Sequence, residues 1–346
     1  MLRATQAVFG AAVLTAAMFS LAQSQIGVKG GLAFTGVNFA GAEFTSDQIP
    51  GIFEQHYTYP KTSSIDYFAA KGMNIIRLAV LWERLQHSLG AKLEEPEMQR
   101  IDAVVDYAAT KGMKTIIDVH NYASYGKAMI GTRKTPRDAL GNLWGQVASR
   151  YKGNDAVIFG LMNEPTGLPT ETWLAAANIA IAEIRKTGAK NLIMVPGNGW
   201  SSARDWASSK YGTPNSRAML NLVDPGQNYV FEVHQYFNKD FTGAQADCQS
   251  VDIGVTSLTP FTNWARDRRK RGFLGEFGVG SDPVCLETLD RVLKFMAANS
   301  DVWLGWAYWA AGSWWEKDYY TNLEPTDGKD RPQMTVLEKY LKKSVR

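Results

Sequence analysis

The sequence predicts one α/β domain folded as a (β/α)8 TIM barrel, and three observations support this prediction. Eight short apolar runs alternate with longer amphipathic or polar segments along the 346 residues, a pattern that favours parallel strands joined by helices. The runs are apolar on both faces, as in strands covered by helices. Finally, no Gly-x-Gly-x-x-Gly follows the first run, which disfavours an open dinucleotide-binding sheet.

The eight expected strands are spread along the whole chain. They are residues 33–41, 74–82, 114–122, 156–164, 191–198, 229–237, 272–280 and 302–310. Helical segments lie between them, and several end at a glycine that follows Lys or Thr, namely Gly72, Gly112, Gly153 and Gly188. Because a left-handed glycine often closes a helix, we expect that conformation at all four.

The N-terminal residues differ from the rest of the chain. A positive start, "MLR", precedes a short apolar stretch from Ala11 to Ala22 that ends in small residues. This pattern is typical of a secretory signal, so we expect residues 1–24 to be cleaved near residues 22–24 and the protein to be secreted. The stretch is shorter than the roughly 20 residues that a membrane span needs. Residues 25–346 are then expected to form the single folded domain.

Charge and cysteine content limit the possible partners and cofactors. The net charge is only +3, which gives no sign of a nucleic acid or membrane partner. Two cysteines, Cys248 and Cys285, are most simply one disulfide in an exported protein, and two free buried thiols are the alternative. The four histidines form no metal-ligand motif such as HExxH. We expect no metal and no cofactor, and we expect a monomer.

Polar residues gather where the expected strands end. Arg77 lies inside the second strand, and the others close later strands: His120, Asn121, Asn163, Glu164, His234, Tyr236, Glu276 and Trp309. In a barrel these strand ends face the active-site mouth. Each residue alone has a structural explanation, such as a core histidine or a glutamate that caps a helix. Their concentration near one rim nevertheless predicts a functional site.

The chemistry that these residues suggest is acetal cleavage. A glycosidic bond is hydrolysed by a proton donor to the leaving oxygen and a second carboxylate, which acts as nucleophile when the two lie about 5–5.5 Å apart. Our hypothesis is that Glu164 is the acid/base and Glu276 the nucleophile. Arg77 near Glu276 would favour the charged form of that carboxyl group, and Tyr236 would donate a hydrogen bond to it.

Residues next to the glutamates are expected to support them. Glu232 is interpreted as a buried structural partner, with Arg77 as its candidate counterion. Strict alternation would point Asn163 and Glu164 to opposite faces, so we expect a twist or bulge that brings both to the mouth. Pro165 is expected to hold Glu164 in an extended conformation.

The motifs as they stand resemble glycoside hydrolase family 5, a family of retaining barrel enzymes whose acid/base and nucleophile end strands four and seven. The matching segments span Gly36 to Trp315 and are "GVNFAG", "NIIRLAVLWERLQ", "DVHNYA", "GLMNEP", "VPGNGWSSA", "EVHQYF", "LGEFG" and "WAYWAAGSWW". A lone "NEP" is a weak signal, whereas "NEP" together with "GEFG" and "VHNY" is strong. The family's functional positions correspond to Arg77, His120, Asn163, Glu164, His234, Tyr236, Glu276 and Trp309.

This resemblance implies particular roles for four residues. Asn163 should bind the sugar 2-hydroxyl, and His234 should lie beside the acid/base. Trp309 should form the floor of the subsite before the scissile bond. Members often carry a cis peptide after that tryptophan, which here is the bond between Trp309 and Ala310.

The wording "GVNFAGAEF" and "VPGNGWSSA" is most similar to the family's fungal-type endo-β-1,4-glucanases (cellulases), which are single-disulfide barrels, in keeping with a Cys248–Cys285 pair. No linker or cellulose-binding module appears, which favours soluble or amorphous β-glucan as the substrate. Three other functions stay open. They are an endo-β-1,4-mannanase, a xyloglucan- or lichenan-active glucanase, and a catalytically silent carbohydrate-binding barrel, although binding alone requires neither glutamate.

Aromatic residues are the expected sugar platforms, because pyranose rings present an apolar C–H face. Trp200, at the end of the fifth strand, is expected on the leaving-group side. Trp309, Trp314 and Trp315 are candidates on the other side, together with Phe39 near the end of the first strand.

Overall fold

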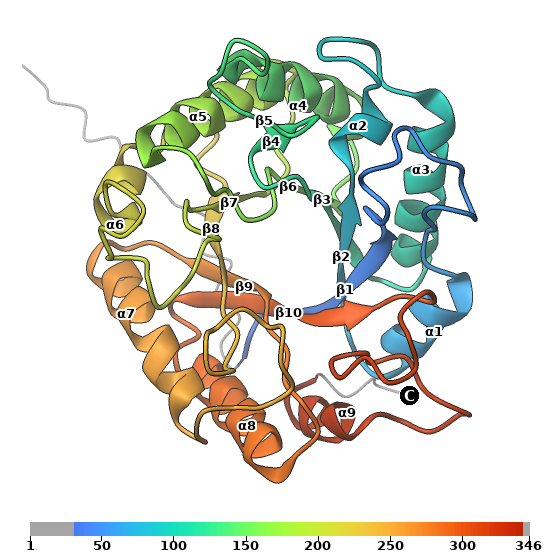
Figure 1. The fold of residues 1–346 in the computed structure, drawn as a ribbon, viewed down its shortest axis with the longest axis vertical. Coiled ribbons are helices and arrows are strands. Elements are labelled where there is room, and N and C mark those ends of the chain that lie inside the picture. Colours follow the sequence, from blue (N-terminus) through green and yellow to red (C-terminus); the bar gives the residue numbers. More distant parts are fainter. Residues whose placement is uncertain (1–30, 342–346) are drawn as a thin grey trace, which may run out of the picture.

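The structure is a computed structural model that describes residues 31–341, and its centre is a closed barrel of eight parallel strands (Figure 1). In order around the barrel they are β1 (Phe34–Ala42), β2 (Ile75–Val80), β3 (Lys114–Val119), β6 (Val157–Gly160), β7 (Ile193–Pro196), β8 (Tyr229–His234), β9 (Gly272–Glu276) and β10 (Trp303–Ala311). Strand β10 pairs with β1 and closes the ring. Each predicted run overlaps one of these strands, so the predicted fold is confirmed.

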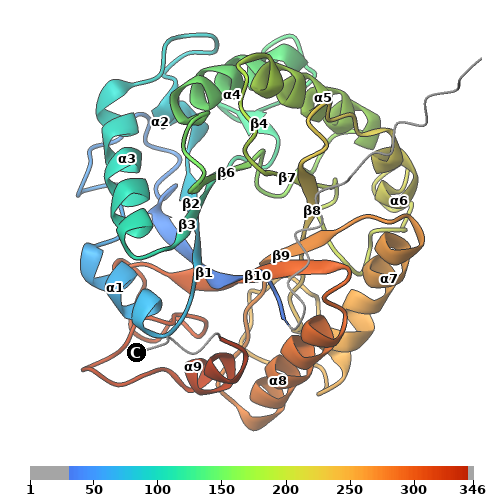
Figure 2. The same ribbon diagram turned by 180° about the vertical axis from the view of Figure 1, so that it is seen from behind.

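Helices surround the barrel as an outer layer, which is clear from both ends (Figures 1 and 2). The longer ones are α1 (Thr62–Ala70), α3 (Glu95–Thr110), α4 (Arg137–Tyr151), α5 (Thr170–Lys186), α7 (Ile253–Asp267) and α8 (Pro283–Ala298). The shorter elements are α2 (Trp82–Leu85), α6 (Asn215–Ala218), α9 (Pro332–Leu337), the 3-10 helices η1 (Met219–Asn221) and η2 (Glu338–Tyr340), and the hairpin of β4 (Ser124–Tyr125) and β5 (Ala128–Met129).

The helices form where apolar residues recur with helical spacing. In α3, the residues Met98, Ile101, Val105 and Ala108 recur every three or four positions and are all buried, so one face of the helix packs on the barrel. Three of the four predicted helix-closing glycines have positive φ, with values of 97° at Gly72, 72° at Gly112 and 88° at Gly188. The prediction for Gly153 was wrong, because its φ is not positive; the chain leaves α4 through a right-handed turn at Lys152.

The barrel interior is apolar at one end and polar at the other. Its apolar part is a cluster of buried residues from seven strands: Ile75, Ile116, Ile158, Met194, Val230, Phe273, Leu304 and Ala307. Two positions further along their strands lie Arg77, Asp118 and Glu232, which alternation points to the same inner face. The polar side chains therefore lie toward the C-terminal ends of the strands, where barrel enzymes bind substrate.

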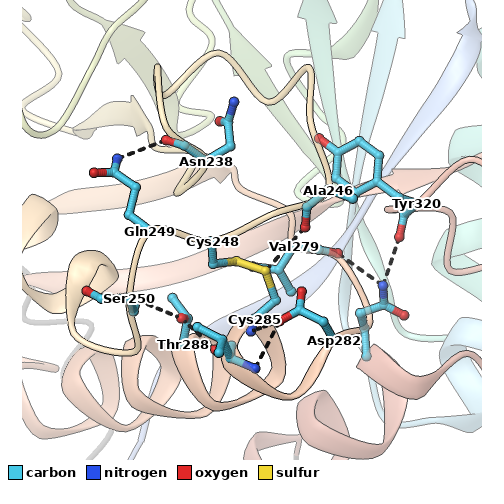
Figure 3. Close-up of a disulfide and its surroundings, with 12 residues drawn as sticks. Asn238, Ala246, Cys248, Gln249, Ser250, Val279, Asp282, Cys285, Thr288 and Tyr320 are labelled. Carbon is cyan, nitrogen blue, oxygen red and sulfur yellow. Dashed lines mark hydrogen bonds between the residues drawn. A yellow bond between two sulfur atoms is a disulfide. The ribbon is translucent and has the colours of Figure 1, made fainter.

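The predicted disulfide between Cys248 and Cys285 is present, with a Cα–Cα distance of 5.2 Å, so the alternative of two free thiols is wrong. It joins the loop after β8 to the first turn of α8 (Figure 3). The carboxylate of Asp282 caps that turn by accepting from the backbone N–H groups of Val284 and Cys285.

The predicted signal, residues 1–24, lies outside the described residues. Within residues 31–341, no helix is both long enough and apolar enough to cross a bilayer.

Candidate active site

Arg77 is the centre of the polar end of the barrel. Its guanidinium lies 3.0 Å from Asp118, 2.8 Å from Glu232 and 2.9 Å from Glu276, measured between nitrogen and oxygen. The side chain is fully buried, and burial opposes its charge, but the carboxylates outweigh burial and raise the pKa of Arg77 above its ordinary value. The predicted pairing of Arg77 with Glu232 and its position near Glu276 are thus confirmed. A charge buried this deeply is stable only with such partners.

Two asparagines complete the contacts of Arg77. Its Nη1 donates to Asn38 Oδ1 at 2.9 Å, and its Nη2 donates to Asn163 Oδ1 at 2.8 Å. Because the oxygen of Asn163 faces the arginine, its Nδ2 is turned away and is buried with no hydrogen-bond partner among the described residues. A buried donor without a partner is costly, so a ligand hydroxyl is its natural acceptor.

Glu276 is the last residue of β9 and is held from two sides. Arg77 binds Oε1, and the Tyr236 hydroxyl donates to Oε2 at 3.1 Å. The preceding residue, Gly275, leaves room for the side chain of Glu232, since a Cβ on Gly275 would lie 2.3 Å from Glu232 Oε1. Burial raises the pKa of Glu276, although the positive charges of His234 and Arg77 oppose that rise.

Glu164 reaches the mouth by a different backbone path from the predicted one. Strand β6 ends at Gly160, four residues earlier, and Glu164 has a φ of +42°. The prediction that Pro165 holds it extended was wrong. Contacts of its neighbours explain this, because the N–H of Asn163 donates to Val119 O at 2.7 Å and Pro165 O accepts from the N–H of Trp200 at 3.2 Å. Between these anchors the chain turns through a left-handed residue, a conformation that costs energy in a non-glycine residue.

His234 links the two glutamates. Its Nδ1 lies 2.8 Å from Glu164 Oε1 and 3.7 Å from Glu276 Oε2, and its Nε2 lies 3.1 Å from Glu232 Oε1. Burial opposes protonation of the ring, but Glu276, Glu164 and Glu232 outweigh it and raise the pKa of His234 to about 10. The imidazolium can then donate to Glu164 and Glu232 at once.

The spacing of the two glutamates is that of a nucleophile and an acid/base. One carboxylate oxygen each of Glu164 and Glu276, together with a nitrogen of His234, lie within 4.8 Å of one another. This spacing agrees with the roughly 5–5.5 Å carboxyl separation of retaining glycosidases. The same three groups offer atoms that a metal ion uses. In this structure the carboxylates of Glu276 and Glu164 lie instead against Arg77 and His234.

His120 and Asn121 follow β3 but have different surroundings. His120 Nδ1 lies 2.8 Å from Asp118 Oδ2, and its ring stacks on Trp309 with centroids 5.6 Å apart. Asn121 does not reach the mouth. Its Oδ1 accepts from the N–H of Trp82 and its Nδ2 donates to Glu83, because consecutive residues of an extended chain point to opposite sides. Asn121 therefore supports the site from behind.

Aromatic rings line the side of the mouth next to β10. Trp309 donates through Nε1 to the hydroxyl of Tyr319 at 3.0 Å, and Tyr319 stacks on Trp315 with centroids 4.1 Å apart. The bond between Trp309 and Ala310 is cis, as the resemblance implied.

Phe39 was wrongly predicted to be a platform. It is fully buried and packs edge-on against Phe68 of α1, with ring centroids 5.7 Å apart. Its side chain points outward from the strand into the layer between barrel and helices.

A pocket of about 610 Å³ opens on the other side of Glu164. Trp200 is 45% exposed there and meets Tyr211 edge-to-face at 5.4 Å. Tyr211 and Tyr122, which also lines the pocket, were not predicted. Tyr211 belongs to a long loop, where strand-end reasoning gives no signal. Tyr122 follows directly after "HN", so its position beside His120 and Asn121 was the one available clue.

The C-terminal mouth of this closed barrel holds two glutamates at this separation, and one of them faces an open pocket. These features define the class of the protein as a glycoside hydrolase with the carboxyl spacing of enzymes that retain the anomeric configuration. Residues 35–312 match the family model described as cellulase, glycosyl hydrolase family 5. The chain belongs to glycoside hydrolase family 5, and the predicted membership is confirmed.

Relatives and solved structures agree with this membership. The chain is 36% identical to endo-β-1,4-glucanase B of Aspergillus niger over 308 residues, which cover 88% of this chain and 89% of that protein. The structure of XacCel5A in complex with cellopentaose is 47% identical with a TM-score of 0.88, over 89% of this chain and 99% of that one. Pseudomonas stutzeri endoglucanase Cel5A in complex with cellobiose is 35% identical with a TM-score of 0.82, over 92% and 95%.

Proposed function

We propose that the protein is a secreted endo-β-1,4-glucanase that cleaves internal bonds of cellulose or soluble β-glucans with retention of configuration. The observation that carries this proposal is the pair formed by Glu164 and Glu276, whose carboxylate oxygens lie within 4.8 Å of each other and whose surroundings differ. The names of the relatives and the cellopentaose bound to XacCel5A support β-1,4-glucan as the substrate class. Export rests on the signal pattern in residues 1–24.

The surroundings of the two glutamates support opposite roles. Glu164 lines the open pocket with Trp200, where the leaving part of the chain would lie, so it is the acid/base. Glu276 lies deeper, against Arg77 and Tyr236, which orient it and stabilise its charge, so it is the nucleophile.

Two displacements complete the reaction. In the first, a carboxylate oxygen of Glu276 bonds to the anomeric carbon while the glycosidic C–O bond breaks, and the leaving oxygen takes the proton of Glu164. In the second, Glu164 accepts a proton from water, the water oxygen bonds to the anomeric carbon, and the bond to Glu276 breaks. His234 beside Glu164 supplies a positive charge during the step in which Glu164 is negative.

Other residues would bind the sugars. Asn163 Nδ2, the buried donor without a partner, would bind the 2-hydroxyl next to the scissile bond. Trp309 and Trp200 would present their faces to the sugar rings on the two sides of that bond. His120 supports the face of Trp309, and Asn121 holds the loop that carries His120.

The test is reducing-sugar release from carboxymethylcellulose, barley β-glucan, xyloglucan and mannan, with wild type and Glu276→Gln side by side. We expect activity on the first two substrates and its loss in the variant. Glu97→Gln is a matched control, because Glu97 is also a buried glutamate but lies in α3 and binds the hydroxyls of Tyr57 and Tyr59. Activity on mannan alone would overturn the glucanase assignment, activity on no substrate would favour a binding protein, and near-normal turnover by Glu276→Gln would overturn its role.

A further inference from the structure

The loop between β8 and α7 packs against the reacting groups through the ring of Tyr236. The hydroxyl of Tyr236 donates to Glu276, and behind the ring lies the main chain of Gly243. A Cβ placed on Gly243 would lie only 2.6 Å from Cδ1 of that ring. Real side chains do not approach so closely, so the ring has its position because residue 243 has no side chain.

Gly243 is itself fixed on both sides of its Cα. Its N–H donates to Asn238 Oδ1 at 2.9 Å, and its carbonyl accepts from the hydroxyl of Tyr320. Asn238 is buried, and its Nδ2 donates to Asp240 at 2.6 Å and to Gln245 at 2.7 Å. One buried amide therefore organises the turn that carries Gly243, and a residue of a different loop holds it from the other side.

The far end of this loop is also tied down (Figure 3). Gln249 Nε2 donates to the carbonyl of Asn238 at 2.9 Å, and the adjacent Cys248 is bonded to Cys285 of α8. Because α8 follows β9, the disulfide connects the loop behind Tyr236 with the segment that follows Glu276. The turn at Gly243 thus has little freedom to move away from the ring.

We propose that Gly243 is a positioning residue for the reaction. Its main chain sets how far the Tyr236 ring lies from the barrel axis, and so keeps the hydroxyl on Oε2 of Glu276. The inference rests on the proposed function, in which Glu276 is the nucleophile. Gly243 is not among the residues that line the pocket beside Glu164, so its effect on turnover passes through Tyr236.

The test compares two glycine-to-alanine variants at positions with the same positive φ. Gly243 and Gly112 both have a φ of +72°, but a Cβ on Gly112 would meet nothing within 4 Å. Gly112→Ala should lose stability through backbone strain alone, and Gly243→Ala should lose more, because its Cβ must also displace the Tyr236 ring. With barley β-glucan, Gly243→Ala should lower kcat about ten- to a hundredfold, the value of a hydrogen bond to a charged group, with KM changed less than about twofold. Gly112→Ala should keep the kcat of the wild type.

A double-mutant cycle separates positioning from a general structural effect. In a Tyr236→Phe background the hydroxyl is gone, so Gly243→Ala should cause no further loss of kcat. Tyr320→Phe gives a milder second test, because it removes only the donor to Gly243 O. It should lower kcat about two- to fivefold in the wild type and not at all in the Tyr236→Phe background.

The outcomes distinguish this inference from the proposed function. If Gly243→Ala matches Gly112→Ala in kcat, or if its effect adds fully to that of Tyr236→Phe, the positioning role is overturned while the proposed function stands. An unchanged kcat in Tyr320→Phe likewise counts against it. A wild type without glucanase activity, or an active Glu276→Gln variant, would overturn both.

Discussion

At the scale of single residues, Arg77 determines the shape of the site. It lies inside a strand, it is fully buried, and its guanidinium binds Asp118, Glu232 and Glu276 at once. The cost of burying one cation and three carboxylates is offset only because they meet in one place. This geometry holds the carboxylate of Glu276 in place, and for the proposed nucleophile it is the preorganisation that catalysis requires.

Replacing Arg77 should therefore destabilise the fold as well as stop turnover. Arg77→Met leaves three buried carboxylates without their counterion, and we expect a loss of about 3–5 kcal/mol in the free energy of unfolding. Urea denaturation followed by tryptophan fluorescence measures it. Arg150→Met is the control, because Arg150 also binds two carboxylates but at the surface, where such pairs contribute below about 1 kcal/mol. Equal losses in the two variants would contradict this explanation.

The hydrogen bond from Tyr236 to Glu276 should be visible in the pH dependence of activity. Burial already raises the pKa of Glu276, against the opposing charges of His234 and Arg77. Since the proposed nucleophile acts as a carboxylate, activity should fall on the acid side at a higher pH than for an ordinary glutamate. Tyr236→Phe removes a donor that stabilises the carboxylate, so the acid limb should move to still higher pH.

The measurement is kcat/KM against pH on a soluble β-glucan for wild type and Tyr236→Phe. Tyr122→Phe is a suitable comparison, because Tyr122 is also at the mouth but contacts the His120 ring edge-on and has no hydrogen bond to Glu276. A limb that moves to lower pH in Tyr236→Phe would show that the hydroxyl does not stabilise the charged form.

At the scale of elements, the loops after the strands place the residues of the candidate site. The segment after β6 carries Glu164 and the segment after β7 carries Trp200, and a hydrogen bond between Pro165 and Trp200 joins the two. The proposed acid/base and the proposed aromatic platform therefore share one backbone connection. Gly199 makes room for the ring that supports this platform, since a Cβ there would lie 2.3 Å from the Tyr211 ring.

Trp200 should act on the leaving-group side only. We expect Trp200→Ala to lower kcat/KM on cellopentaose about tenfold, mainly through KM. The stacking of one sugar ring on tryptophan contributes about 1.4 kcal/mol, which corresponds to a tenfold change. With β-cellobiosyl fluoride, whose leaving group is one atom, the variant should match the wild type. Equal losses on the two substrates would place Trp200 on the other side of the scissile bond or in a purely structural role.

At the scale of the whole molecule, the pairing of β1 with β10 closes the barrel, and one disulfide links the loop after β8 to α8. The disulfide joins residues that are 37 apart in sequence, so it removes conformational freedom from the unfolded chain. Replacing both Cys248 and Cys285 by serine should lower the free energy of unfolding by about 2–4 kcal/mol. Thermal and urea unfolding of the double variant test this, and the wild type under a reducing agent should behave in the same way. Unchanged stability would contradict it.

The sequence by itself predicted the barrel and most residues of the candidate site, and it favoured the disulfide over two free thiols. The alternation of apolar strand segments with helical segments follows from local hydrophobicity. In a barrel of parallel strands, the C-terminal ends of all strands lie at one rim. Glu164, Glu276, Arg77, His234 and Tyr236 were all found by that rule. The rule also explains why Tyr211 was missed, since it lies on a loop whose course no strand pattern describes.

Only the tertiary structure decided the conformation of each side chain and of the turns. The left-handed turn at Glu164 depends on hydrogen bonds that reach Val119 and Trp200, residues distant in sequence. The outward direction of Phe39 and Asn121 likewise depends on which neighbour each packs against. Local propensity cannot specify such features, because their free energies come from contacts that exist only after the chain has closed into a barrel.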